Sequence, residues 1–170
     1  MALNFDVVGV KGDPVESSWT SKDTLLYALG VGAGVNDLPF VTENTGGVPQ
    51  QVLPTFAVIA ASGGGAIRDT GADFRKLVHG SQAFEIRGGA LPAEGKLNVS
   101  GVVTGIYDKG SGAVITSVGT GVDPETGEVR IITRSEIVVR GERGVGGEAG
   151  PHDNCPAPER EPDRDDALES

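Results

Sequence analysis

The pattern of apolar and polar positions changes near the middle of the chain. Between residues 21 and 34, leucine and valine recur at helical spacing; Ser21 or Thr20 can cap the first turn, and glycines mark the end. Pro54 suits the first position of a second short helix within residues 53–62. The first half of the chain is therefore predicted to contain two short helices.

From residue 83 onward, apolar and polar residues alternate in segments separated by turn signals, a pattern typical of strands. The predicted strands cover residues 83–88, 96–108, 112–122 and 128–140. In the last of them, the odd-numbered residues from 129 to 139 share one face. Glycine-containing turns at 108–112 and 123–127 suit connections between antiparallel neighbours. Helices followed by hairpin-connected strands predict an α+β fold with an antiparallel sheet.

Charge and composition distinguish the last 30 residues from the rest of the chain. Its 170 residues carry 24 acidic and 14 basic side chains. Residues 141–170 alone hold nine acidic and three basic ones, with many Gly and Pro and few large apolar residues. Such a segment buries too little apolar surface to fold by itself. We predict one domain over residues 1–140 and a flexible acidic tail over 141–170, and the negative charge argues against a nucleic-acid partner.

Cysteine usage and hydropathy suggest the compartment. The chain has one cysteine, Cys155, which excludes an intrachain disulfide and a zinc site built from several cysteines and fits a reducing environment. We found neither a run of 18 apolar residues nor a signal-peptide pattern at the start. A cytoplasmic protein without a membrane partner is expected.

Five sequence blocks at matching spacing carry a family resemblance. They are WTSKDTLLYALGVGAG, VLPTFAVIA, LVHGSQAFEIRGGALPAEGKL, VTGIYDKGSGAVI and RSEIVVRGERGVGG. In this order the sequence resembles the N-terminal half of MaoC-like enoyl-CoA hydratases, the hydratase 2 family, over about residues 10–147. The resemblance implies a hot-dog fold, in which a curved antiparallel β-sheet is wrapped around a central helix.

The same resemblance implies a division of labour between two hot-dog halves. In the family, the first half accommodates the acyl chain. The second carries a Gly-Asp-x-Asn-Pro-x-His motif, whose Asp and His add water across a 2-enoyl thioester. The present chain departs from this pattern, because Phe74 lies five residues before His79 and Gly147 lies five before His152. No Asp/His pair at the required spacing is found, so a catalytic role for this chain alone is not expected.

Several residues are candidates for contact with an acyl-CoA. Tyr27, Leu53 and Phe56 could line an acyl tunnel, although ordinary core packing explains aromatic and aliphatic residues equally well. His79 and Gln82 are expected at a helix-to-strand junction. There they either bond to the backbone of a turn or reach the thioester.

A second group of candidates concerns the phosphates of CoA. Lys109, Gly110 and Gly112 could offer an ammonium group and backbone amides to anions, although the same residues make a good hairpin turn. Arg140 and Arg143, near the end of the last predicted strand, are alternative phosphate contacts.

Together these observations predict a non-catalytic subunit of a 2-enoyl-CoA hydratase. It would shape the acyl-CoA site and work with a second MaoC-like hot-dog subunit that carries the catalytic motif, in fatty-acid or steroid side-chain β-oxidation. No cofactor is expected, since acyl-CoA is the substrate. Two alternatives stay open: a stand-alone homodimer that binds acyl-CoA without catalysis, and a truncated fragment of a two-domain hydratase.

Overall fold

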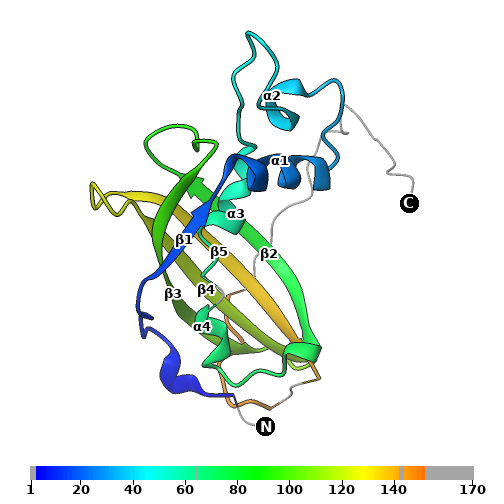
Figure 1. The fold of residues 1–170 in the computed structure, drawn as a ribbon. Helices are drawn as coiled ribbons and strands as arrows, with labels where there is room; N and C mark the ends of the chain where they lie inside the picture. Colours follow the sequence, from blue (N-terminus) through cyan, green and yellow to red (C-terminus); the bar gives the residue numbers. More distant parts are fainter. Residues whose placement is uncertain (1–2, 64, 142–143, 152–170) are drawn as a thin grey trace.

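Five strands form one curved antiparallel sheet (Figure 1) in the computed structural model, which describes residues 3–63, 65–141 and 144–151. The strands are β1 (Val15–Trp19), β2 (Leu77–Ile86), β3 (Gly95–Asp108), β4 (Gly112–Val122) and β5 (Val129–Arg140). Their order across the sheet is β1-β3-β4-β5-β2, so β1 and β2 form the two edges. The expected α+β class is confirmed.

Short helical segments complete the fold. They are the 3-10 helices η1 (Phe5–Val7), η2 (Pro54–Phe56) and η3 (Phe74–Lys76), and the α-helices α1 (Ser21–Gly30), α2 (Leu38–Val41), α3 (Ala57–Ala60) and α4 (Gly65–Arg68). At the start of α1, the backbone N–H of Thr20 donates to Asp23 Oδ2 at 2.7 Å, and so does its hydroxyl. These bonds from Thr20 hold the pKa of the Asp23 carboxyl below its usual value. The predicted first helix begins at the expected residue and ends at Gly30, the first of the three glycines (30, 32 and 34) that marked its end.

The inner, concave face of the sheet is covered by α3 and α4 rather than by one long helix (Figure 1). The connection between these helices lies directly on the sheet because three glycines allow it. A Cβ atom on Gly101 would lie 2.4 Å from Gly63 O, and one on Gly119 would lie 2.7 Å from Gly63 N. Beside this contact, the buried hydroxyl of Thr133 donates to Ala61 O at 2.9 Å.

Two apolar clusters fill the ends of the inner face. One is centred on Phe56, whose ring meets Trp19 edge-on at 6.0 Å and Tyr27 at 5.4 Å between centroids. Trp19 is further fixed because its indole N–H donates to Pro92 O at 3.1 Å. The other cluster packs around Ile115 on β4 at the opposite end of the sheet. Both clusters contain only residues whose side chains are largely withdrawn from solvent.

The edge strands differ most from the sequence prediction. β1 was not predicted, and β2 begins at Leu77 rather than at residue 83. His79 therefore lies inside a strand, and its expected place at a helix-to-strand junction is wrong. β2 exposes polar residues on both faces, and β1 is only five residues long with a single buried side chain, so neither shows the extended alternation that marks a half-buried strand. In addition, a bulge at Gly80 interrupts the register of β2 against β5.

The first part of the predicted tail returns along β3. Asp108 Oδ2 accepts a bond from the Val145 backbone N–H at 3.0 Å, and the Asp108 backbone N–H donates to Glu148 O at 3.0 Å. Val145 also packs against the cluster around Ile115. Residues 144–151 are thus held against the domain. The boundary at residue 140 and the flexibility of the tail stay predictions, since residues 152–170 lie outside the described part.

Candidate ligand-binding face

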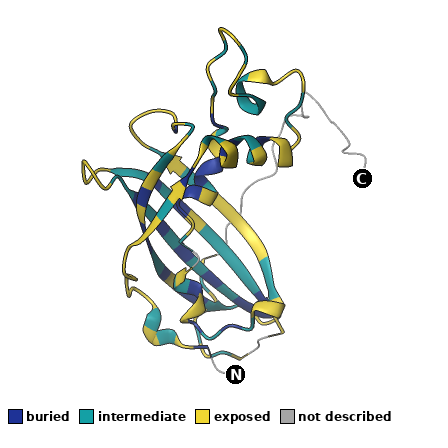
Figure 2. Ribbon diagram, in the orientation of Figure 1, coloured by how far each residue is buried: buried dark blue, intermediate teal, exposed yellow. Residues whose placement is uncertain are grey.

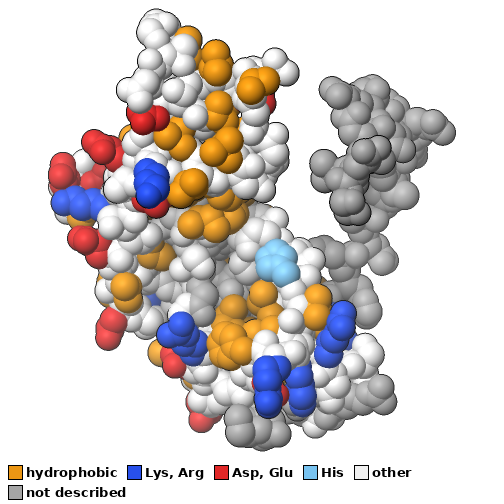
Figure 3. Space-filling model, turned by 45° about the vertical axis from the view of Figure 1, so that its right-hand side comes forward, with side chains coloured by type: hydrophobic (Ala, Val, Ile, Leu, Met, Phe, Trp, Pro, Cys, Tyr) orange, Lys and Arg blue, Asp and Glu red, His pale blue; other side chains and the backbone are white. Residues whose placement is uncertain are grey.

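The inner face of the sheet is open in its middle, near the β2 edge. On β5, Ile131, Thr133 and Val139 point inward and are buried, whereas Ser135 and Ile137 between them are half-buried. Their neighbours across on β2 are exposed (Figure 2). The space-filling view shows a histidine beside a hollow on this side, with hydrophobic side chains above and below it (Figure 3). The middle of the inner face is therefore accessible to a ligand.

A polar group lines this open region. Gln82 pairs with Ser135 across the strands, and His79 pairs with Ile137. Ser135 Oγ donates to Gln82 Oε1 at 2.6 Å, and His79 Nε2 lies 3.3 Å from the same oxygen. Gln82 Nε2 donates to Ala83 O at 3.3 Å. One amide oxygen thus ties an imidazole and a hydroxyl from two strands into one cluster.

The bulge at Gly80 explains why His79 and Gln82 share a face. Side chains on a regular strand alternate, so residues three apart point to opposite sides. Here the register shifts between His79 and Ser81, and the extra residue, Gly80, brings both polar side chains to the inner face. A Cβ atom at residue 80 would lie only 3.1 Å from Glu136 O, which favours glycine there.

An aromatic region adjoins the cluster. Phe84, two residues beyond Gln82 on β2, packs against the core cluster around Phe56, as Tyr27 does. A separate cavity of about 500 Å³ lies at the opposite, β1 edge of the sheet, where Tyr27, Phe56 and the 57% exposed Ile59 line it. Its size lies within the range of small-molecule sites. Leu53 is half-buried and caps η2, and it does not contact this cavity.

The turn between β3 and β4 lies far from the aromatic region, at the same end of the sheet as the start of β2. Gly112 pairs with Arg140 at one end of the sheet, whereas the aromatic cluster contacts the other end of strands that are about 35 Å long. The turn also satisfies its own groups. Gly110 N–H donates to Asp108 Oδ1 at 2.8 Å, and Lys109 Nζ donates to Pro151 O at 2.9 Å. Arg140 is exposed near this turn, and Arg143 lies outside the described residues.

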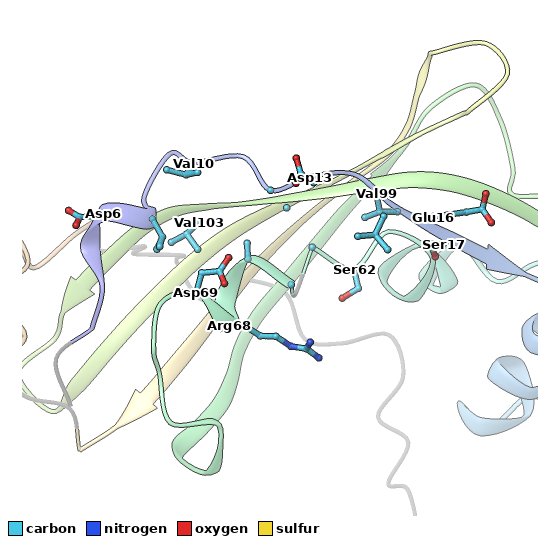
Figure 4. Close-up of a pocket in the computed structure, with 17 residues that line it drawn as sticks. Asp6, Val10, Asp13, Glu16, Ser17, Ser62, Arg68, Asp69, Val99 and Val103 are labelled. Carbon is cyan, nitrogen blue, oxygen red and sulfur yellow. The ribbon is translucent and has the colours of Figure 1, made fainter.

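A second cavity, of about 680 Å³, opens on the other side of the inner face (Figure 4). Val99 and Val103 of β3 form its apolar floor. Its rim carries five charged residues, namely Asp6, Asp13, Glu16, Arg68 and Asp69. Four carboxylates against one guanidinium repel phosphate groups, so this cavity is a poor entrance for CoA.

The structure thus brings together some of the predicted residues and separates others. Tyr27 and Phe56 are in contact, and His79 and Gln82 are bonded to each other, whereas Lys109 and its turn stand apart. Sequence reasoning missed the part that Ser135 plays, although the alternation along β5 had placed it on the same face as Ile131 and Thr133. No cluster of three or more potential metal ligands is found within the described ranges. Nor does any helix there have the length and hydropathy of a membrane span.

Comparison with known proteins agrees with this architecture. A MaoC-like dehydratase from Phytophthora capsici superposes with a TM-score of 0.69 at 23% identity, over 95% of this chain and 59% of that one. A chain of the ChsH1-ChsH2 complex from Mycobacterium tuberculosis gives 0.52 at 17% identity, over 79% of this chain and 98% of that one. The molecule therefore has the hot-dog fold of MaoC-like proteins, as the resemblance had implied.

Sequence similarity identifies the family. The model of the MFE-2 hydratase 2 N-terminal domain matches residues 17–141, and the chain belongs to this family. Among curated proteins, 3-hydroxyacyl-thioester dehydratase Y from Mycobacterium tuberculosis is 44% identical over 167 residues. That alignment covers 96% of this chain but 57% of the relative. The chain thus spans little more than half the length of this relative.

Proposed function

We propose that this chain forms the acyl-accommodating half of a 2-enoyl-CoA hydratase and that a second hot-dog unit supplies the catalytic Asp/His pair. The observation that carries the proposal is the open β2 edge beside an uncovered inner face. An edge strand offers unpaired backbone groups to another strand, and a partner docked there would also cover the accessible face. The hot-dog complex ChsH1-ChsH2 supports an arrangement of this kind.

The substrate class follows from the family and from the chemistry of the face. The relative named above acts on 3-hydroxyacyl thioesters by its name, and the aromatic region around Tyr27 and Phe56 suits an acyl chain. Catalysis would come from the partner, because His79 is bonded to an amide, Gln82, rather than to a carboxylate. Acyl-CoA is then the substrate, no cofactor takes part, and the single cysteine suits a reducing, cytoplasmic setting.

Co-expression with a separately encoded hot-dog chain that carries the Gly-Asp-x-Asn-Pro-x-His motif tests this proposal. We expect the two chains to co-elute and to hydrate crotonyl-CoA together, whereas this chain alone is inactive. Hydrogen exchange should show new protection of backbone amides in residues 79–83, with the β1 edge, residues 15–19, as the internal control. Turnover by this chain alone, or unchanged exchange along β2 in an active complex, would contradict the proposal.

The length of the relatives favours one variant of the same function. Since this chain covers 57% of 3-hydroxyacyl-thioester dehydratase Y, the catalytic half could follow in the same reading frame. Sequencing of the gene beyond residue 170 distinguishes a covalently linked second domain from a separate subunit. A stand-alone homodimer predicts instead a stable dimer of this chain that binds acyl-CoA but forms no active complex with a second hot-dog chain.

A further inference from the structure

The polar cluster on the inner face has hydrogen-bonding capacity that the protein leaves unused. Gln82 Oε1 accepts from Ser135 and faces His79 Nε2. Because an amide oxygen only accepts, the proton of this bond sits on Nε2, and Nδ1 of a neutral ring keeps its lone pair. Nδ1 has no partner among the described residues. Gln82 Nε2 donates one of its two hydrogens, to Ala83 O, and the other has no partner in the same part of the chain.

Each of these unused groups can bond to a secondary amide. The Gln82 N–H can donate to an amide carbonyl, and the His79 Nδ1 can accept from an amide N–H. Both side chains are exposed, and both face the inner side because of the bulge at Gly80. A buried structural pair would have satisfied these groups within the protein.

The order of side chains along β2 indicates how a ligand would be oriented in this site. Phe84 packs against the aromatic cluster, Gln82 and His79 follow on the same face, and Lys76 lies immediately before the strand. About 10 Å of extended strand separates residues 79 and 76. Lysine and arginine side chains gather below the histidine on this face (Figure 3). The order is apolar, then amide-binding, then cationic.

We propose that His79 and Gln82 bind an amide of the pantetheine arm of an acyl-CoA. In this arrangement the acyl chain lies toward Phe84 and the phosphates lie toward the start of β2. An acyl-CoA carries an apolar chain, amide groups and phosphates in the same order. The inference rests on the proposed function. It adds the orientation of the bound thioester and names the residues that contact its pantetheine arm.

Calorimetric titration of the full chain with three thioesters tests this proposal. Hexanoyl-CoA and hexanoyl-N-acetylcysteamine contain an amide, and S-ethyl hexanethioate does not. The variant Gln82→Leu should weaken binding of the first two by about three- to tenfold, the value of one hydrogen bond, and leave the third unchanged. His79→Phe should show the same selectivity. Ser81→Ala is the matched control, because Ser81 points to the outer face, where its hydroxyl donates to Glu136.

The possible results distinguish failure of this inference from failure of the proposed function. Equal losses for all three thioesters would mean a structural or purely apolar role, and unchanged binding by both variants would mean no contact; either result overturns the inference alone. A loss confined to partner association, with thioester affinity retained, overturns it as well. If the unaltered chain binds none of the thioesters, the proposed function fails and the inference fails with it. Unfolding midpoints verify that each variant remains folded.

Discussion

The contact between Gly63 and Gly119 allows a quantitative prediction for Gly119→Ala. The added Cβ would lie 2.5 Å from Thr133 Oγ1, 2.6 Å from Ala61 O and 2.7 Å from Gly63 N. Two of these neighbours are backbone atoms, which can move only together with the connection between α3 and α4. The third belongs to the buried hydroxyl that donates to Ala61 O, so the same methyl group also breaks this bond.

The magnitude follows from two effects. Overpacking of a close-packed core costs about 1–3 kcal/mol, and loss of a buried hydrogen bond costs about 1 kcal/mol. We therefore expect Gly119→Ala to reduce the free energy of unfolding by about 2–4 kcal/mol, which for a chain of this size lowers Tm by about 6–12 °C.

Urea denaturation followed by circular dichroism measures this change. Gly30→Ala is the matched control, because a Cβ there meets nothing within 4 Å. It should stabilise the chain by up to about 1 kcal/mol, since alanine is the better helix former. If the free energy of unfolding of Gly119→Ala lies within about 0.5 kcal/mol of that of the unaltered protein, the α3–α4 connection does not rest on the sheet and the reasoning is refuted.

Three further predictions concern single side chains. Trp19→Phe replaces the bicyclic indole by a single ring, so both the indole hydrogen bond and some core packing are lost, and the free energy of unfolding should fall by about 1–3 kcal/mol in urea; an unchanged midpoint would argue against that bond. Hydrogen bonds from Arg75 lower the pKa of Asp73 from 3.8 to about 2. The ionised Asp73 side chain should therefore stabilise the protein relative to Asp73→Asn above about pH 4, and this stabilisation should be lost as the pH falls toward 2. Acid unfolding of both proteins measures the difference, and parallel curves would contradict the prediction. Asp108→Ala should release residues 144–151, and limited proteolysis should cut there faster than in the unaltered chain.

The central strands could be predicted from the sequence because their alternation is strong. The face that the pattern assigned to Ile131, Thr133 and Ser135 is the inner face of the sheet. The start of α1 was also predictable, since Thr20 and Asp23 provide a local capping signal. These features depend on neighbours in the sequence, which a reading of residue order captures.

The edges and the site depended on contacts that no local pattern encodes. The first half of β2 exposes polar residues on both faces and β1 is only five residues long, so hydropathy gave no strand signal. The pairing of Gln82 with Ser135 joins residues 53 positions apart. Whether the inner face is covered or open depends on how closely the α3–α4 connection approaches β4, which becomes visible only in three dimensions.

The bulge at Gly80 has a consequence for comparing relatives of this chain. Because the extra residue is absorbed between His79 and Ser81, its deletion would leave a regular strand with His79 still opposite Ile137 and Gln82 still opposite Ser135. A relative one residue shorter here can therefore present the same two polar groups as His-x-Gln instead of His-x-x-Gln. Alignments of this segment should match residues by the side of the sheet they occupy, and a one-residue gap at position 80 should not be counted as loss of the pair.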